Sequence, residues 1–120
     1  MNNPTEHSHA MLEVDPAMPI SSVSVEAIKD AKDGYNLHLT VTNYTWAPEN
    51  VNGTPVQGEG HAHVYVNGVK VARLYSDWFH LGADNLGDGE NVIEVTLNAN
   101  DHSEWVQNEH HISDTVTLTK

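Results

Sequence analysis

The stretch Gly60–Gly68, with the sequence GHAHVYVNG, alternates strictly between apolar side chains and polar or aromatic ones. Successive side chains of a β-strand point to opposite faces, so this pattern predicts a strand with one apolar core face. The other face then carries His61 and His63 side by side, about 6–7 Å apart at Cα. The Asn67-Gly68 pair that ends the stretch is the strongest short signal for a tight hairpin turn. Two imidazoles at this spacing could bind one metal ion.

The same kind of alternation recurs at short intervals along the chain. It predicts strands at residues 20–28, 35–43, 60–66, 69–75, 90–97 and 111–119. The first two are expected to pair as an antiparallel hairpin through a five-residue turn with Asp-Gly punctuation. No segment shows a helical period over about 11 residues. The expected fold is therefore all-β, an antiparallel β-sandwich of about seven strands.

The length of 120 residues predicts a single domain. We expect an irregular N-terminal arm at residues 1–18 and one β-sandwich domain at residues 19–120. Residues 44–58 are rich in Asn, Pro and Gly, which predicts a long ordered loop across one end of the sandwich. Tyr44 and Trp46 would anchor this loop by burying large apolar rings.

The charge balance limits the partners that the chain can bind. Seventeen acidic residues against five basic ones give a net charge of −12. Nucleic acid is excluded because its recognition needs a basic surface, and anionic membrane surfaces are disfavoured for the same reason. No apolar run approaches the roughly 20 residues of a membrane span, so membrane insertion is not expected. A cationic partner such as a metal ion is favoured, although high solubility alone would also explain the charge.

The sequence has no cysteine, which excludes disulfides and thiolate metal sites. It shows no signal peptide, since Met1 is followed by a polar segment. Met1 is either a native start or an initiator residue placed before a trimmed mature domain. The His-rich, acidic and Cys-free composition favours the second interpretation, and therefore a periplasmic or secreted location.

Nine histidines are the main compositional outlier. If the strands at 60–66 and 69–75 pair through the Asn-Gly turn, His80 would lie near His61. His102 follows the strand at 90–97 and could fold over the end of the sheet. The predicted metal ligands are therefore His61, His63, His80 and His102, with Asp101 and Tyr65 supporting them from outside. Imidazole nitrogen suits copper(II) and zinc, which are the two expected metals. The simpler alternative is that these histidines are surface residues that bind no metal.

The remaining histidines are weaker candidates. His7 and His9 could add ligands from the arm, but a solvated terminal segment explains them equally well. His110 and His111 are adjacent, so on a strand they point to opposite faces and make poor co-ligands. His38 is expected on an outward, solvated strand face.

Three segments of the chain resemble one known family. They are Gly58–Gly68, Lys70–Tyr75 and Val95–His102, which ends in the sequence LNANDH. The chain is similar there, and more broadly over residues 34–118, to small secreted bacterial β-sandwich proteins without assigned activity. The resemblance implies an exported immunoglobulin-like or cupredoxin-like sandwich and brings no catalytic residues. More loosely, the HxH strand and later Asn-Asp-His loop resemble periplasmic copper-handling sandwiches. The chain lacks their Met-rich loop and Cys ligand, so a blue-copper centre is excluded.

Three functions remain open from the sequence. The first is an exported module that binds copper(II) or zinc for storage, delivery or sensing, with the metal ion and possibly another exported protein as partners. The second is a carbohydrate- or protein-binding module whose platform is made of Trp46, Trp78 and Trp105. The third is a mononuclear metalloenzyme in which Asp101, Glu104 or Tyr65 acts as general base. The sequence shows no nucleophile elbow or phosphate-binding loop, which leaves this third function without a catalytic motif.

Overall fold

The computed structural model of the chain describes residues 10–120. These residues form strands and two short 3₁₀ helices, with no longer helix among them. The strands are β1 (Met11–Glu13), β2 (Ser22–Lys29), β3 (Tyr35–Thr42), β4 (Thr45–Trp46), β5 (Glu59–Val66), β6 (Val69–Leu74), β7 (Trp78–Leu81), β8 (Glu90–Asn98), β9 (Glu104–Gln107), β10 (His110–His111) and β11 (Ser113–Thr119). The 3₁₀ helices are η1 (Pro48–Asn50) and η2 (Ala83–Asn85).

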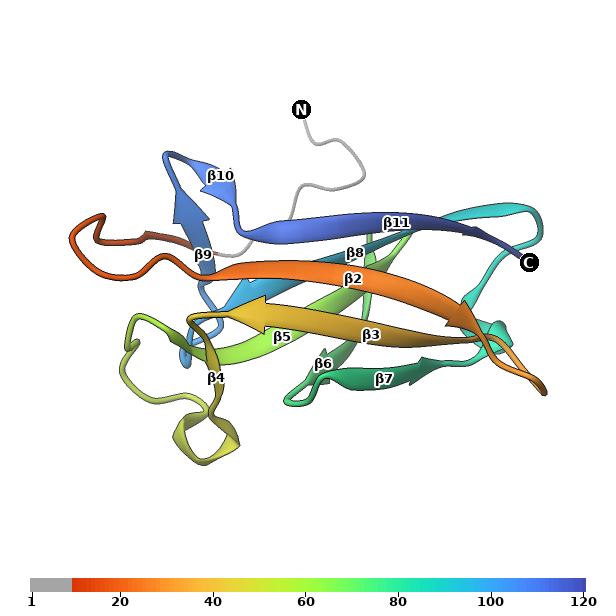
Figure 1. The fold of residues 1–120 in the computed structure, drawn as a ribbon, viewed down its shortest axis with the longest axis horizontal. Helices are drawn as coiled ribbons and strands as arrows, with labels where there is room; N and C mark the ends of the chain where they lie inside the picture. The colour runs from red at the N-terminus through yellow and green to blue at the C-terminus, as the bar shows by residue number, and fades with distance from the viewer. Residues whose placement is uncertain (1–9) are drawn as a thin grey trace.

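The strands form two sheets that face each other (Figure 1). The larger sheet has eight strands, with β5 and β8 paired at its centre, and β6, β4, β11, β9, β10 and β1 attached around them. The smaller sheet has the order β2-β3-β7 and is antiparallel. The backbone N–H of Val25 on β2 donates to the carboxylate of Asp114 on β11 at 2.8 Å, which links the two sheets along one side.

The all-β class is confirmed, but the plain antiparallel sandwich of about seven strands is not. The larger sheet is mixed, because β1 runs parallel to β9 and β4 runs parallel to β5. The first pair joins opposite ends of the described chain, the second joins consecutive strands across the loop that contains η1, and each involves a strand of only two or three residues. Met11–Glu13, which the sequence assigns to the irregular arm, forms one of them. Alternation over two or three residues is too short a signal to predict a strand.

The hydrophobic core lies between the two sheets. On β5 and β8, the apolar side chains pair directly across the strands, as Ala62 with Leu97, Val64 with Val95, and Val66 with Ile93. The smaller sheet contributes Leu37 and Leu39 from β3, which are fully buried. The core face predicted from the alternation of residues 60–66 is therefore confirmed.

Both expected hairpins form. The two-residue turn between β5 and β6 has Asn67 at φ 50° and Gly68 at φ 85°, the positive values that a tight hairpin turn of this kind requires. The turn between β2 and β3 is closed by Asp30, whose carboxylate accepts the backbone N–H groups of Lys32 and Asp33 and the side-chain amide of Asn36.

The hydrogen bonds at Asp30 give this turn a testable pH dependence. The backbone N–H of Lys32 contributes most, followed by the backbone N–H of Asp33 and the side-chain amide of Asn36, and together they lower the pKa of Asp30 from 3.8 to about 2. Because the folded-state pKa is depressed, these contacts stabilise the turn above the ordinary carboxyl pKa and are lost as pH falls toward 2. In an NMR titration, we expect the Asp30 carboxyl to titrate near pH 2. A midpoint near 3.8 would contradict these contacts.

Candidate metal site

The face of β5 opposite the core is also buried, although it is polar. His61 pairs with Asn98 across the sheet, His63 with Thr96, and Tyr65 with Glu94. His61 and His63 are both 0% exposed, and their pairing partners are buried too. The simpler alternative, in which these histidines are solvated surface residues, is therefore wrong. Burying polar side chains costs stability unless they are paired, and hydrogen bonds within the layer meet part of this cost: the Thr96 hydroxyl donates to the amide oxygen of Asn98, whose amide nitrogen donates to the carbonyl of His102.

His61 and His63 point toward each other from one strand. Their Nε2 atoms lie 3.1 Å apart, and their ring centroids are 4.9 Å apart. Two nitrogens of a tetrahedral zinc site with Zn–N bonds near 2.0–2.1 Å are separated by roughly 3.3 Å. Without a metal the two nitrogens share a hydrogen bond, and their separation is also close to the one that a metal ion requires.

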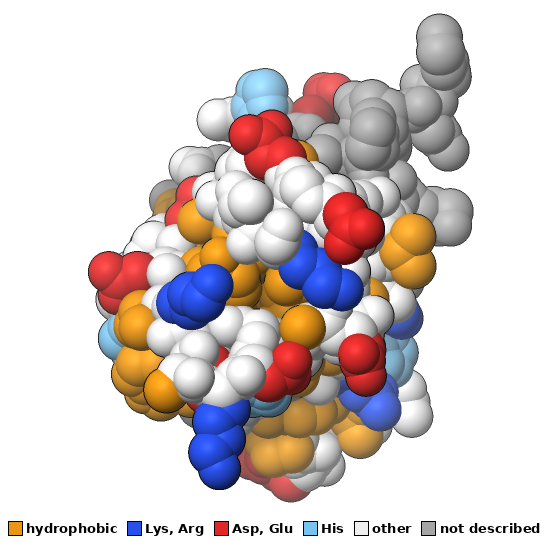
Figure 2. Space-filling view, turned by 90° about the vertical axis from the view of Figure 1, so that its right-hand side faces the viewer, with side chains coloured by type: hydrophobic (Ala, Val, Ile, Leu, Met, Phe, Trp, Pro, Cys, Tyr) orange, Lys and Arg blue, Asp and Glu red, His pale blue; other side chains and the backbone are white. Residues whose placement is uncertain are grey.

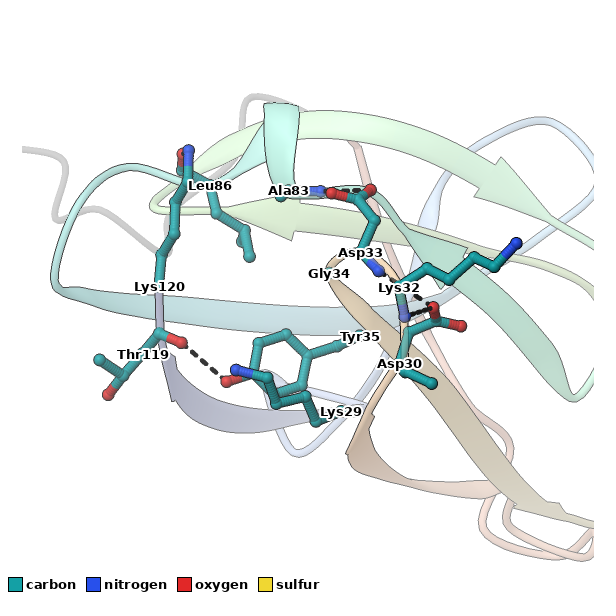
Figure 3. A pocket seen from close by; sticks show the side chains of 11 residues that line it. Lys29, Asp30, Lys32, Asp33, Gly34, Tyr35, Ala83, Leu86, Thr119 and Lys120 are labelled. Atoms are coloured by element: carbon teal, nitrogen blue, oxygen red, sulfur yellow. Dashed lines mark hydrogen bonds between the residues drawn. The ribbon is translucent and has the colours of Figure 1, made fainter.

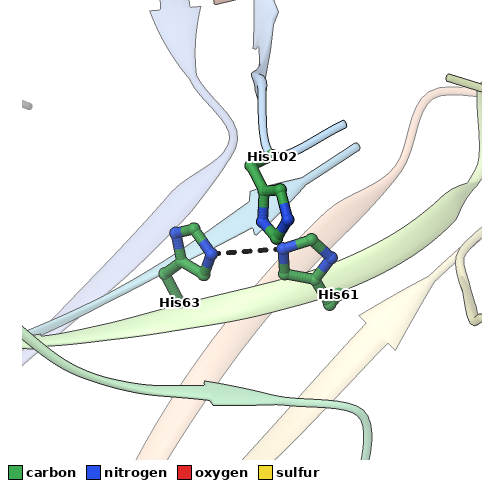
Figure 4. A group of neighbouring side chains, drawn as sticks. All are labelled: His61, His63 and His102. Carbon is green, nitrogen blue, oxygen red and sulfur yellow. Dashed lines mark hydrogen bonds between the residues drawn. The ribbon is translucent and has the colours of Figure 1, made fainter. Parts of the chain in front are cut away.

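His102 completes the cluster from the turn that follows β8 (Figure 4). In this turn the backbone N–H of His102 donates to the carbonyl of Ala99 at 2.8 Å, and His102 itself has φ 74°. Its ring lies 4.8 Å from that of His61 and 6.0 Å from that of His63, between centroids. Among the described residues, these three histidines are the group whose ligand atoms all lie within 4.8 Å of one another. The cluster could hold a metal ion after the ring of His102 moves inward by up to about 1.5 Å.

The hydroxyl of Tyr44 holds β5 and β8 together at the end that carries the histidines. It donates to the backbone carbonyl of Asn98 at 2.7 Å, and the carbonyl oxygen of His61 lies 3.1 Å from the same hydroxyl. Burial raises the pKa of Tyr44, so the hydroxyl keeps its proton. Gly60 leaves room for this contact, since a Cβ there would lie 2.0 Å from the Asn98 carbonyl oxygen. The backbone immediately before His61 is thus held by a close contact that only glycine permits at position 60.

Tyr65 and Asp101, the two residues expected to support the ligands, lie close to the cluster in the sequence and differ in what they contact. Tyr65 is buried with its ring centroid 6.3 Å from that of His63. Burial, and then the carboxylates of Glu104 and Glu94, raise the pKa of Tyr65, so it is a neutral phenol beside the site. Asp101, expected to support the ligands, accepts the backbone N–H of Ser103 at 3.0 Å and so stabilises the turn that carries His102.

His80 lies away from this cluster, contrary to the expectation that it joins His61. The strand pairing of β5 with β6 ends at Leu74, and the chain then crosses to the smaller sheet, where β7 pairs with β3. His80 is half exposed there, and its Nδ1 lies 2.8 Å from the amide oxygen of Asn36. A hairpin predicts where its two strands run, but it does not predict which sheet the chain joins next.

His38 and His111 also lie outside the cluster of His61, His63 and His102. His38 stacks on Trp78 with ring centroids 4.3 Å apart, and Nδ1 of His111 lies 3.0 Å from the buried carboxylate of Glu104. His111 is therefore more than a solvated surface residue. His7 and His9 lie outside the described residues.

Sequence reasoning missed two residues that contact the cluster. Asn52, in the long loop after η1, has its amide oxygen 2.7 Å from Nε2 of His102. Tyr75, just after β6, has its ring centroid 5.4 Å from that of His61. The strand pairing of His63 with Arg73 places Tyr75 beside His61, so the hairpin register could have indicated it. Asn52 had no local signal beyond the unusual length of its loop.

A surface hollow lies at the end of the molecule opposite the histidine cluster. It has a volume of about 260 Å³, and its lining includes Lys29, Lys32 and Lys120, three of the five basic residues (Figure 3). Figure 2 looks onto this end and shows basic side chains beside apolar surface. The Nζ of Lys120 donates to the carbonyl of Leu86 at 3.2 Å, so these two lining residues are joined to each other. The length of β8 separates it from the histidines, because Thr119 pairs with Glu90 at the far end.

Comparison with known proteins adds no assignment to this geometry. The chain matches no family model, no curated protein and no solved structure. The resemblance to secreted β-sandwich proteins therefore stays a prediction. Among residues 10–120, no helix is long and apolar enough to cross a membrane.

Proposed function

We propose that this protein is an exported metal-binding module that takes one copper(II) or zinc ion through His61, His63 and His102. The observation that carries the proposal is the pair of buried imidazoles with Nε2 atoms 3.1 Å apart and a third imidazole within reach. Three neutral nitrogen ligands with a fourth position left for water or a partner suit both metals. The role would be storage, delivery or sensing in the periplasm or outside the cell.

The charge of the whole chain supports this proposal. A net charge of −12 produces a field that attracts cations and raises their local concentration near the protein. The burial of His61 and His63 supports it as well, because a metal ion held there would be largely shielded from water, where its attraction to the ligands is stronger.

Metal binding should raise the thermal stability of the protein. An ion that binds the folded chain alone, at a free concentration 100 times its Kd, adds about 2.7 kcal/mol to the free energy of unfolding. For a chain of this length, that corresponds to a rise in Tm of roughly 10 °C. Zinc or copper(II) added to untagged protein should produce this shift with one ion per chain. An unchanged Tm at saturating metal would contradict the proposal.

The aromatic binding platform has weaker support. Trp78 is 55% exposed, which favours a contact surface on the smaller sheet. Trp105 is only 4% exposed, and the indole N–H of Trp46 donates to the carboxylate of Asp77 at 2.9 Å. Two of the three tryptophans are thus anchored in the fold, and a single exposed ring makes a small platform.

A mononuclear metalloenzyme would need a general base near the open coordination position. Asp101 accepts the backbone N–H of Ser103, and Glu104 is paired with His111, so each of these carboxylates is held in a structural contact. Tyr65 is a buried phenol whose pKa is raised, which makes it a poor base. The geometry therefore favours binding of the ion over a reaction on it.

A further inference from the structure

The loop that follows η1 reaches the third histidine of the cluster through one side chain. The amide oxygen of Asn52 lies 2.7 Å from Nε2 of His102. An amide oxygen only accepts hydrogen bonds, so in this contact the imidazole nitrogen donates and Nε2 carries the proton. In a neutral imidazole, the lone pair is then on the other nitrogen, Nδ1.

A set of contacts fixes the backbone of Asn52 against the turn of His102. The backbone N–H of Asn52 donates to the carbonyl of Asn100 at 2.7 Å. The side-chain amide of Asn100 donates in turn to the carbonyl of Thr54 and to the carboxylate of Glu59. Asn50 donates to the same carboxylate at 2.7 Å, so both sides of Asn52 are tied to the start of β5. The loop holds Asn52 in place independently of its contact with the imidazole.

We infer that Asn52 is a positioning residue that selects Nδ1 as the nitrogen by which His102 binds the metal. This inference rests on the proposed function. His61 and His63 meet through their Nε2 atoms, so the ligand set is two Nε2 nitrogens and one Nδ1 nitrogen. Partners of this kind orient a ligating imidazole and fix its tautomer, and their loss typically costs 10- to 100-fold in metal affinity.

Two substitutions of Asn52 distinguish the effect of its amide oxygen from the effect of its backbone conformation. Asn52 has φ 68°, which glycine adopts freely and which aspartate tolerates better than most residues. Asn52→Gly removes the acceptor, whereas Asn52→Asp keeps an oxygen acceptor in the same place. Asn108→Gly is a matched control, since Asn108 is also exposed with a positive φ of 52° and belongs to the turn between β9 and β10.

Zinc is the probe, because it is diamagnetic and lets long-range ¹H–¹⁵N NMR correlations report the imidazole tautomers. In metal-free wild-type protein, we expect His102 to carry its proton on Nε2, and in zinc-loaded protein to bind through Nδ1. Asn52→Gly should mix the tautomers of His102 and lower zinc affinity roughly 10- to 100-fold. Asn52→Asp should keep the Nε2–H tautomer of His102 and the wild-type zinc affinity. Asn108→Gly should change neither the tautomer nor the affinity.

The outcomes distinguish this inference from the proposed function. Zinc binding by Asn52→Gly at wild-type affinity, or coordination of His102 through Nε2, would overturn the inference while leaving the metal site in place. A wild-type chain that binds neither zinc nor copper(II) but keeps the Nε2–H tautomer of His102 would overturn the proposed function, and Asn52 would then be a structural contact only.

Discussion

Replacing His63 with alanine is expected to abolish stoichiometric binding of zinc or copper(II). The side chain is fully buried and contributes one of two nitrogens that already lie 3.1 Å apart. Without it, His61 and His102 remain as two ligands, which is fewer than the three protein ligands of an open zinc site. The loss should exceed the 10- to 100-fold that removal of a ligand's outer partner costs, measured by isothermal titration with a competing chelator.

His80→Ala is the matched control for this experiment. His80 is half exposed on β7, outside the cluster, so its removal should leave the affinity unchanged. Because His63→Ala also empties buried space, its thermal unfolding is measured first. His102→Ala, at a partly exposed position in a turn, provides a second variant that should fold and still bind weakly. Wild-type affinity in either folded variant, His63→Ala or His102→Ala, would contradict the assigned site.

Gly60→Ala is expected to cause the largest loss of stability by a single methyl group near the site. Gly60 has φ 150°, and an added Cβ would lie 2.0 Å from the carbonyl oxygen of Asn98 and 2.6 Å from the hydroxyl oxygen of Tyr44. The overlap forces β5 and β8 apart where His61 pairs with Asn98. We expect the free energy of unfolding to fall by about 3 kcal/mol or more, measured by urea denaturation. Any folded fraction should also bind metal more weakly.

Gly89→Ala separates the steric overlap from backbone strain. Gly89 has φ 84°, which also disfavours alanine, but no atom outside its chain neighbours lies within 4 Å of an added Cβ. Its substitution should cost only about 1 kcal/mol. If Gly60→Ala costs no more than Gly89→Ala, the close packing of β5 on β8 at this end is wrong.

Local patterns predicted the parts of the fold that depend on neighbouring residues. The alternation of residues 60–66 gave the correct core face, with Val64 fully buried. Asn67-Gly68 gave the correct turn, because positive φ at both positions is a local requirement. The segment predicted at 90–97 is β8, and its antiparallel pairing with β5 brings the turn of His102 to His61.

Non-local pairing could not be read from the same patterns. The short parallel strand β1 joins a partner far along the chain and β4 joins the next strand, and no periodic signal is present in so few residues. The transfer of β7 to the smaller sheet likewise decides the position of His80, yet alternation in β7 is equally compatible with either sheet. His61, His63 and His102 were therefore predictable as candidates, whereas the exclusion of His80 required the sheet topology.

The burial of the polar face was also outside what alternation can show. A half-polar strand predicts one solvated face, but Thr96, Asn98 and Glu104 are buried together with the two histidines. Buried polar layers break the usual rule that polar faces meet water, and such departures concentrate at functional sites. The departure at β5 and β8 coincides with the histidine cluster, and this coincidence adds to the support that the close Nε2 atoms of His61 and His63 give for a site there.

Anomalous diffraction from crystals of untagged protein loaded with zinc or copper(II), collected at the absorption edge of the metal, tests the central claim most directly. We expect one anomalous peak per chain, bonded to Nε2 of His61, Nε2 of His63 and one nitrogen of His102. A peak beside His80 and Asp33 instead, or a histidine cluster without metal at saturating concentration, would contradict it.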